Sequence, residues 1–569
     1  MESKIAKFYE KVIGAIESGT VTNKEQLGKY KLKAGKQIGI ATLPSNPNIL
    51  MHAKTPSEQM VQLLSIKPLR TLSGVAPVAI MTKPISCPHG TCIYCPGGPK
   101  SVFGSVPQSY TGHEPATMRA ISNNYDSYKQ TMNRICQYYA IGHNPEKLEL
   151  IIMGGTFPSF PQEYQNEFIG EAFRAANDFS EMFFDMQGKF EAEKFSEFFT
   201  NKMGKTPDLA QNQKPYTLLD VQKEHLRNEK SHVRIVTLCI ETKPDWSFEK
   251  EINSMLELGA TRVEIGAQSI YNEVLKYTNR GHTIEDTIKV TQLLKDSALK
   301  VTYHIMPGQP QSNPQKDIEM FSELFENENY CPDALKIYPC MVMPGTALAK
   351  LYENKKFIPL TTEQAAEIIA QGFRYIPEYV RVHRVQRDIP TKYALTGIDK
   401  NNLRQIIEEK MKEHSIVQRD IRFRESGIKS QKGIFTDYSS VELIERRYKA
   451  SGSEEVFISF EDTTNDIILG FCRLRKPNKP FRQEFTPTTA CIRELHVFGS
   501  EVGIGKHNQS SSQHKGFGKK MVEHAEEIAR TEFGYDKMLV ISGVGARDYY
   551  SRKLGYQKSG IYMAKNLKN

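Results

Sequence analysis

The stretch Cys87-Pro88-His89-Gly90-Thr91-Cys92-Ile93-Tyr94-Cys95 places three cysteines in nine residues, with gaps of four and then two residues between them. Its prolines and glycines disfavour helix and strand, so a single loop could point three thiolates inward. Structural zinc sites and ordinary electron-transfer clusters use four protein ligands. Three cysteines therefore indicate a 4Fe-4S cluster in which one iron stays open to the amino and carboxylate groups of S-adenosylmethionine (SAM).

The alternative is a zinc loop completed by His89 or by a distant residue, which a bare CxxC usually indicates. Against it, the loop follows a strand-like run at residues 77–81, and the sequence has no second CxxC to close a four-cysteine site. We therefore expect Cys87, Cys92 and Cys95 to hold a cluster whose electron cleaves SAM and releases a 5′-deoxyadenosyl radical.

The charge distribution and the cysteine count indicate the kind of partner and the compartment of the protein. The chain has 569 residues and a net charge of +9; residues 1–75 hold eleven Lys or Arg against five Asp or Glu, so 11 − 5 = +6 lies there. Such a concentration favours an anionic partner such as nucleic acid. Nine cysteines, an odd number with three clustered, indicate a reducing compartment and a cofactor. No apolar run suggests a leader or a membrane span, which predicts a soluble, cytoplasmic protein.

The first 75 residues should form a small basic helical region. Residues 4–18 place their apolar side chains on one helical face, and Gly19 is suited to end that helix. Four lysines follow, namely Lys29, Lys31, Lys33 and Lys36. They could be a solvated lysine-rich face, but we expect them to contact RNA.

Residues 76–400 alternate between short apolar strands and helices. Expected strands lie at residues 77–82, 148–153, 234–240, 261–265, 300–306 and 334–338, and expected helices include residues 283–295 and 314–326. This α/β pattern predicts a partial (β/α)6 barrel that is open at one side. The chemistry of such folds gathers at the carboxyl ends of the strands, which is where the cysteine loop falls.

Other motifs follow the same strand ends. Gly154 and Gly155 would let the backbone approach the methionine amino group closely. Glu241, Glu264 and Gln268 are candidate contacts to the ribose or amino acid part of SAM, with ordinary hydrogen bonding at the barrel end as the alternative.

Three further stretches lead to expectations about segments and a second metal site. Residues 176–232 are polar and weakly patterned, which indicates an inserted or mobile segment. Residues 381–424 are basic and should bridge two domains. Cys331, Cys340 and His383 could form a second metal site, although scattered cysteines are more often small buried hydrophobes.

Residues 401–569 have a different organisation. Strands expected at 467–473 and 491–498 precede Gln513-x-x-Gly516-x-Gly518, a helix with an apolar stripe, and a strand at 537–541. Glycines at a helix N-terminus form a cradle for pyrophosphate. This order resembles the GNAT acetyltransferases, which bind acetyl-CoA. In that fold residues 494–497 would line the pantetheine arm and Tyr550 would be a possible acid, while core packing is the alternative for Tyr549 or Tyr550.

A radical site and a thioester site in one chain favour one joint hypothesis. The radical would take a hydrogen from the acetyl methyl group, the resulting carbon radical would add to an RNA base, and thioester hydrolysis would leave a carboxymethyl group. We expect the open iron to face the thioester. The alternatives are a protein lysine acetyltransferase with a structural barrel and a non-enzymatic tRNA-binding scaffold.

Several runs together resemble the catalytic subunit of Elongator, a tRNA wobble-uridine carboxymethyl(acetyl)transferase family. They are Leu72-Ser73-Gly74-Val75, Cys92-Ile93-Tyr94-Cys95-Pro96-Gly97-Gly98-Pro99, Gln108-Ser109-Tyr110-Thr111-Gly112, Met153-Gly154-Gly155-Thr156-Phe157, Asn279-Arg280-Gly281-His282-Thr283, Tyr303-His304-Ile305-Met306-Pro307-Gly308 and Arg493-Glu494-Leu495-His496-Val497. The resemblance covers residues 65–569. It implies a radical SAM barrel joined to a GNAT domain, a 4Fe-4S cluster, SAM and acetyl-CoA as cofactors, the tRNA anticodon stem-loop as partner, and an electron donor.

The resemblance also implies roles for single residues. Cys87, Cys92 and Cys95 would be cluster ligands, and Lys147 would contact acetyl-CoA at the domain junction. The remaining implied acetyl-CoA contacts are Glu494, Leu495, His496, Val497, Phe517, Gly518, Lys519 and Tyr550. Lys243 stands where the family suggests Arg. The four-residue first cysteine gap is typical of archaeal members and favours a stand-alone or homodimeric enzyme.

Overall fold

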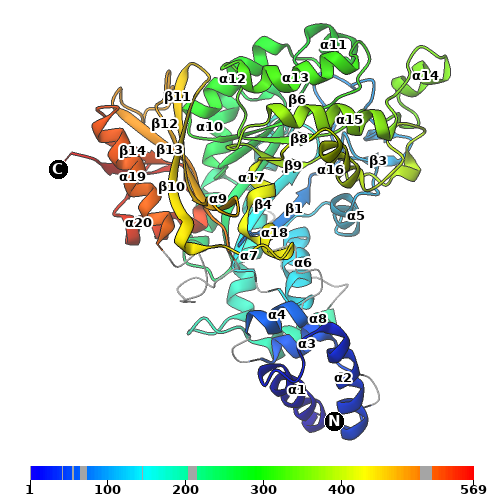
Figure 1. Cartoon of the computed structure of the whole chain (residues 1–569), viewed down its shortest axis with the longest axis vertical. Coiled ribbons are helices and arrows are strands. Elements are labelled where there is room, and N and C mark those ends of the chain that lie inside the picture. Colours follow the sequence, from blue (N-terminus) through cyan, green and yellow to red (C-terminus); the bar gives the residue numbers. More distant parts are fainter. Residues whose placement is uncertain are drawn as a thin grey trace.

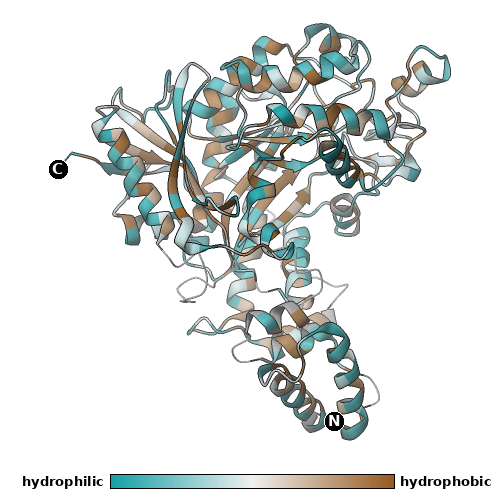
Figure 2. Ribbon diagram, in the orientation of Figure 1, coloured by the Kyte–Doolittle hydropathy of each residue, from teal (hydrophilic) through white to brown (hydrophobic). Residues whose placement is uncertain are grey.

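The computed structural model describes residues 2–40, 43–53, 57–64, 73–143, 145–202, 215–499 and 516–568. Figure 1 shows an N-terminal helical region at one end, a barrel-like α/β domain, and a second α/β domain beside it. Apolar residues concentrate on the strands of the two large sheets, as Figure 2 shows. None of the helices within these residues is long and apolar enough to cross a membrane.

The N-terminal region is a cluster of four helices with its own small core. They are α1 (Glu2–Glu17), α2 (Lys24–Ile38), α3 (Asn46–Met51) and α4 (Glu58–Leu64). Phe8, Val12, Ile16 and Leu27 are buried in this core, which confirms the amphipathic first helix. On α2, Lys29, Lys33 and Lys36 are exposed, and Lys29 forms an ion pair with Glu25 at 2.7 Å.

The barrel domain is built on a seven-stranded parallel sheet in the order β1-β4-β5-β6-β7-β8-β9. The strands are β1 (Ala76–Met81), β4 (Lys147–Met153), β5 (Arg234–Thr242), β6 (Arg262–Gln268), β7 (Lys300–Ile305), β8 (Ala334–Ile337) and β9 (Arg381–Arg384). The six predicted strands are confirmed, so the prediction was one strand short. The missing strand, β9, is only four residues long and mostly basic, and Arg381 pairs with Glu425 at 2.7 Å.

Helices cover this sheet. They are α5 (Pro115–Ser122), α6 (Ser127–Ala140), α7 (Gln162–Phe183), α8 (Ala192–Lys202), α9 (Leu218–Asn228), α10 (Glu249–Glu257), α11 (Asn272–Tyr277), α12 (Ile284–Asp296), α13 (Pro314–Glu326), α14 (Ala347–Glu353), α15 (Thr362–Gly372) and α16 (Leu403–Glu413). A small hairpin, β2 (Gly98–Ser101) with β3 (Gly104–Val106), follows the cysteine loop. Both predicted helices, α12 and α13, are confirmed. They begin where expected because Thr283 forms a capping box at the start of α12 and Pro314 is the first residue of α13.

Residues 176–232, expected to be an inserted or mobile segment, form packed helices where the structure describes them, so the expected mobility is not observed there. The end of α7, α8 and α9 pack onto the barrel core through Phe179, Phe183, Phe195 and Val221, all fully or almost fully buried. These apolar residues are spaced along helices whose other faces are polar, which hid the pattern. Residues 203–214 lie outside the described residues.

The second domain is built on a seven-stranded sheet in the order β10-β11-β12-β13-β14-β16-β15, and among the described strands only the neighbours β13 and β14 run parallel. The strands are β10 (Val441–Ala450), β11 (Ser453–Asp462), β12 (Ile467–Arg475), β13 (Thr489–Val497), β14 (Lys537–Val540), β15 (Gln557–Ser559) and β16 (Tyr562–Asn566), with helices α17 (Ile421–Arg424), α18 (Ser426–Gln431), α19 (Phe517–Thr531) and α20 (Arg547–Leu554). The three predicted strands and the helix after Gly518 are confirmed.

Candidate active site

The cysteine loop follows the carboxyl end of β1 and is held by residues distant in sequence. Cys92 is buried, and its sulfur lies 3.3 Å from His89 Nε2 and 3.6 Å from Arg280 Nη1. The sulfur of Cys95 accepts a hydrogen bond from the Ser109 backbone N–H at 3.2 Å. The sulfur of Cys87 lies 3.6 Å from Thr156 Oγ1. All three thiols thus belong to one loop, and their role as cluster ligands stays a prediction.

The spacing of these sulfurs argues against a single metal ion. With Zn–S bonds of about 2.3 Å, tetrahedral geometry places thiolate sulfurs roughly 3.8 Å apart. Within the described chain, Cys87, Cys92 and Cys95 are not among the groups whose ligand atoms all lie within 4.8 Å of one another. As they stand, the three thiols therefore do not form a compact single-ion site.

Cationic side chains surround the loop. Arg280 is buried against Cys92, and Lys243, also buried, pairs with Asp245 at 3.1 Å. Burial raises the pKa of the Cys87 thiol and raises the pKa of the Cys95 thiol to about 11. A coordinating metal deprotonates such thiols outright, and the two nearby cations would then balance the thiolate charge.

A cavity lies beside the loop, at the carboxyl ends of the strands. Its lining includes Cys87, Met153, Gly155, Glu241, Lys243, Gln268 and Arg280. Gly154 and Gly155 have φ of 118° and 86°, and a Cβ on Gly154 would lie 2.3 Å from Thr82 Oγ1. Only glycine tolerates this combination. Gln268 Oε1 is buried and has no hydrogen-bond partner among the described residues, so the site offers a polar atom of the kind that SAM could meet.

The three candidate SAM contacts, Glu241, Glu264 and Gln268, do not all lie at the cavity. Glu241 and Gln268 line the cavity, whereas Glu264 is fully buried inside the barrel and binds Arg262 at 3.0 Å and Lys336. Glu264 is therefore part of an internal ion-pair network. Glu241 joins that network to the cavity, because it accepts a hydrogen bond from Tyr110 at 2.9 Å and lies 3.3 Å from Lys336 Nζ.

The second metal site expected from Cys331, Cys340 and His383 is not formed. Cys331 precedes β8, Cys340 follows it, and His383 belongs to β9. Among the described residues no compact ligand group includes any of the three. The two cysteines are buried, as small hydrophobes usually are.

A second candidate site lies in the other domain where β13 and β14 separate. Their pairing runs from Thr489 opposite Lys537 to Ile492 opposite Val540, while β13 continues to Val497. Helix α19 begins at this opening, after Gly516 with φ 76°. A Cβ on Gly518 would lie 3.4 Å from Val497 Cγ2, so the helix N-terminus closely approaches the diverging strand. Gln513 lies outside the described residues.

The side chains predicted to contact acetyl-CoA here differ in whether they face the core or the surface. Tyr550 is 6% exposed and packs in the domain core, where burial raises its pKa well above the usual range. Tyr549 is exposed, and its hydroxyl oxygen is 3.1 Å from where a Gly518 Cβ would lie. Lys519 is half exposed beside Glu523, at 3.6 Å. The acid role of Tyr550 stays a prediction. Tyr549 is the tyrosine whose hydroxyl approaches the N-terminus of α19 at Gly518.

The two candidate sites lie at opposite ends of the barrel strands. Lys147 begins β4 beside Arg234, and Arg234 is 4.0 Å from Asp548 of α20. The imidazole of His496, on β13, lies 3.1 Å from the Ser73 carbonyl oxygen just before β1. The second domain therefore packs on the amino ends of the strands, whereas the cysteines follow a carboxyl end. Seven residues of β4 at about 3.3 Å each span roughly 20 Å, so the expected face-to-face arrangement is not observed.

One feature of the cysteine site was not predicted. Arg280 belongs to a sequence run noted only for its family resemblance, yet its guanidinium contacts Cys92 and donates to the Gly266 carbonyl oxygen at 3.2 Å through Nε. Gly281 next to it would carry a Cβ 2.7 Å from His89 Cβ. The sequence signal that could have pointed to this contact was the pair Arg280-Gly281 in the short loop between α11 and α12.

Comparisons with known proteins agree with this geometry. Residues 85–324 match the Radical SAM superfamily, residues 332–413 the Radical_SAM C-terminal domain and residues 423–556 the acetyltransferase (GNAT) family. The predicted fold class is confirmed. The radical SAM match implies a 4Fe-4S cluster and SAM, and the GNAT match implies acetyl-CoA.

Relatives match over almost the whole chain. The tRNA uridine(34) acetyltransferase of Methanocaldococcus jannaschii is 46% identical, covering 98% of this chain and 97% of its own. Elongator complex protein 3 of Homo sapiens is 40% identical, covering 95% and 93%. The solved structure of Methanocaldococcus infernus Elp3 with an N-terminal deletion has a TM-score of 0.70 and 42% identity, covering 87% of this chain and 100% of that one. The chain belongs to the family of tRNA uridine(34) acetyltransferases and Elongator complex protein 3.

Proposed function

We propose that this protein modifies the wobble uridine of tRNA and adds a carboxymethyl group, derived from acetyl-CoA, to carbon 5 of the base. The observation that carries the proposal is the presence, in one chain, of a three-cysteine loop beside a cavity that Cys87 lines and of an acetyltransferase sheet whose strands β13 and β14 part after Ile492, the two domains being joined by a buried interface. Family membership supports the substrate, since the archaeal relatives are named for tRNA uridine(34).

When bound, the 4Fe-4S cluster and SAM would supply a 5′-deoxyadenosyl radical. Cys87, Cys92 and Cys95 would hold the cluster. Arg280 would offset the negative charge of the thiolates, and the uncrowded backbone at Gly155 would let SAM approach. An external one-electron donor is part of the proposal, as is action as a single enzyme or a homodimer.

At the other candidate site, the N-terminus of α19 would bind the pyrophosphate of acetyl-CoA through its backbone N–H groups and positive dipole end. Leu495 to Val497 on β13 would line the pantetheine arm. Lys147 lies at the start of β4, at the junction with the acetyltransferase domain, which suits the acetyl-CoA contact that family resemblance implies.

The N-terminal helices would bind the tRNA. Exposed lysines on α2, including Lys33 and Lys36, place positive charge on the surface, where it can contact phosphates. Phosphate contacts of this kind supply sequence-independent affinity for nucleic acids.

Mass spectrometry of the nucleosides in tRNA tests the proposal. The reduced, iron-loaded protein is incubated anaerobically with tRNA, SAM and acetyl-CoA, and we expect a carboxymethylated uridine that requires all three. Acetyl-CoA hydrolysis should rise when tRNA is added. If a histone is acetylated without tRNA and the uridine is unchanged, the protein is a lysine acetyltransferase instead. If neither product forms and the protein binds neither iron nor acetyl-CoA, it is a tRNA-binding scaffold.

A further inference from the structure

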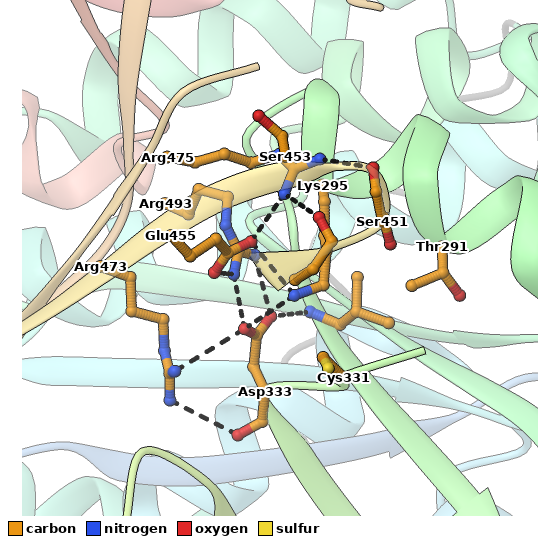
Figure 3. Close-up of polar contacts among 12 residues, drawn as sticks. Thr291, Lys295, Cys331, Asp333, Ser451, Ser453, Glu455, Arg473, Arg475 and Arg493 are labelled. Atoms are coloured by element: carbon orange, nitrogen blue, oxygen red, sulfur yellow. Dashed lines mark hydrogen bonds and ion pairs between the residues drawn. The ribbon is translucent and has the colours of Figure 1, made fainter. Parts of the chain in front are cut away.

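Seven buried charged side chains form an ion cluster between the two domains, and Figure 3 labels six of them. Its members are Lys295, Asp296 and Asp333 from the barrel and Glu455, Arg473, Arg475 and Arg493 from the acetyltransferase domain. Arg493 donates to both oxygens of Asp333, at 2.9 and 2.5 Å, and to Glu455 at 2.5 Å. Buried charges are stable only when they are paired in good geometry, so this cluster fixes how the domains sit together.

The cluster extends to β13 through a β-bulge. In the β12–β13 pairing, Arg473 faces Glu494 while the next residue, Leu474, faces Ile492, which leaves Arg493 as an extra residue. Successive side chains of a regular strand point to opposite faces. Here Arg493 reaches Asp333 and Glu494 forms an ion pair with Lys300, so both point toward the barrel.

The bulge lies just past the point where β13 and β14 part, at the start of the stretch proposed to bind acetyl-CoA. Ile492 is the last residue of β13 paired with β14, and Glu494 is two residues further on. The Glu494 carboxylate also accepts a hydrogen bond from Arg473 Nε at 2.9 Å. The stretch of β13 that would line the pantetheine arm is therefore drawn toward the barrel by two cations, one of which belongs to the barrel itself.

We propose that Lys300 is a positioning residue for acetyl-CoA: by holding Glu494 against the barrel, it keeps β13 apart from β14 before the ligand arrives. The inference rests on the acetyl-CoA site of the proposed function. It assigns to Glu494 a bond to the barrel in place of a direct side-chain contact to the ligand. Pre-formed sites bind more tightly because less ordering is left to the binding step.

Isothermal titration of acetyl-CoA into the full-length protein, without tRNA, tests this. Lys300→Met removes the charge and keeps the length of the side chain. We expect it to raise the Kd by about tenfold, corresponding to ~1.4 kcal/mol. Lys300→Arg should restore binding. Lys316→Met is the matched control, because Lys316 forms a similar ion pair, with Glu273 at 3.0 Å, elsewhere on the barrel domain.

A second variant separates positioning from general stability. Glu494→Gln keeps size and shape, so it should fold even if Lys300→Met does not, and it should weaken acetyl-CoA binding without weakening SAM binding. The double variant should be no worse than either single one, because both remove the same bond. An unchanged Kd in Lys300→Met and Glu494→Gln, or an equal loss of SAM and acetyl-CoA binding, overturns the inference. A wild-type protein that does not bind acetyl-CoA overturns the proposed function instead.

Discussion

The guanidinium of Arg280 lies 3.6 Å from the sulfur of Cys92, although 188 residues separate them in the chain. This contact joins the cysteine loop to the loop between α11 and α12 and places a fixed positive charge beside a sulfur. Hydrogen bonds and charge near the sulfurs tune a cluster's reduction potential. Arg280 is therefore a residue outside the cysteine loop that would influence the reduction potential of a bound cluster.

Replacing Cys92 by Ala should abolish reductive cleavage of SAM, because only two sulfur ligands would remain. Iron content measured after anaerobic reconstitution should fall with it. Cys136→Ala is the matched control, since Cys136 is a buried thiol in the barrel core and should leave both measurements unchanged. Full SAM cleavage by the Cys92 variant would exclude this loop as the cluster holder.

Replacing Gly155 by Ala should weaken SAM binding by about tenfold, because the added methyl group points into the cavity region beside Cys87. Gly104 is a matched control with the same φ of 86° and open space around it. Each change costs about 1–2 kcal/mol of backbone strain, so the difference in SAM titration isolates the ligand effect. Equal SAM affinity in both variants would remove Gly155 from the site.

Replacing Lys33 and Lys36 by Gln should weaken tRNA binding and lower its dependence on salt concentration. Each lost phosphate contact reduces the slope of log K against log salt by about one unit. Fluorescence titrations of tRNA over a range of salt concentrations measure that slope. Lys553→Gln with Lys568→Gln, on the acetyltransferase domain, provides the control. A slope that stays at the wild-type value would leave the two α2 lysines as a solvated surface.

Low pH should break the bond between Glu494 and Lys300. Burial alone would raise the pKa of Glu494, but the charges of Lys300 and Arg473 and their hydrogen bonds lower it to about 2. An unfolded Glu titrates near about 4.3. The stabilisation is therefore complete above about pH 4.3 and is lost as the pH falls toward 2. Urea unfolding at several pH values should show a weaker acid loss in Glu494→Gln; identical profiles would contradict this assignment.

Replacing Asp333 by Ala should destabilise the protein by about 3–5 kcal/mol, because Arg493 and Lys295 would remain buried with one fewer anion. Denaturant unfolding measures the loss. Asp536→Ala is the control, since Asp536 is a partly exposed partner of Lys568 and surface ion pairs contribute less than about 1 kcal/mol. Similar losses in the two variants would show that the ion cluster is not a major source of stability.

Sequence patterns predicted the parts of this fold whose signal is local. Six apolar strands, the three-cysteine loop and the glycine pair could all be placed from residues close together in the chain. Strand β10 was missed because charged residues such as Glu445, Arg447 and Lys449 fill its exposed face, as is common at a sheet edge.

The rest depended on contacts between distant residues. Nothing in the composition of β13 indicates the extra residue that turns Glu494 toward Lys300, because a bulge shows only in the pairing with β12. The same holds for Tyr549 and Tyr550, which are adjacent in sequence but point to the N-terminus of α19 and to the core.

The polarity of the barrel strands has a consequence for turnover. A parallel strand cannot bring its two ends together, and the buried charges at the domain junction prevent the acetyltransferase domain from swinging round to meet the cysteines. The reactants must therefore cover the distance themselves, by the reach of a flexible thioester arm or by the passage of a splayed-out nucleotide along the barrel. Each catalytic cycle should include a transport step that an RNA too short to bridge the two ends cannot complete.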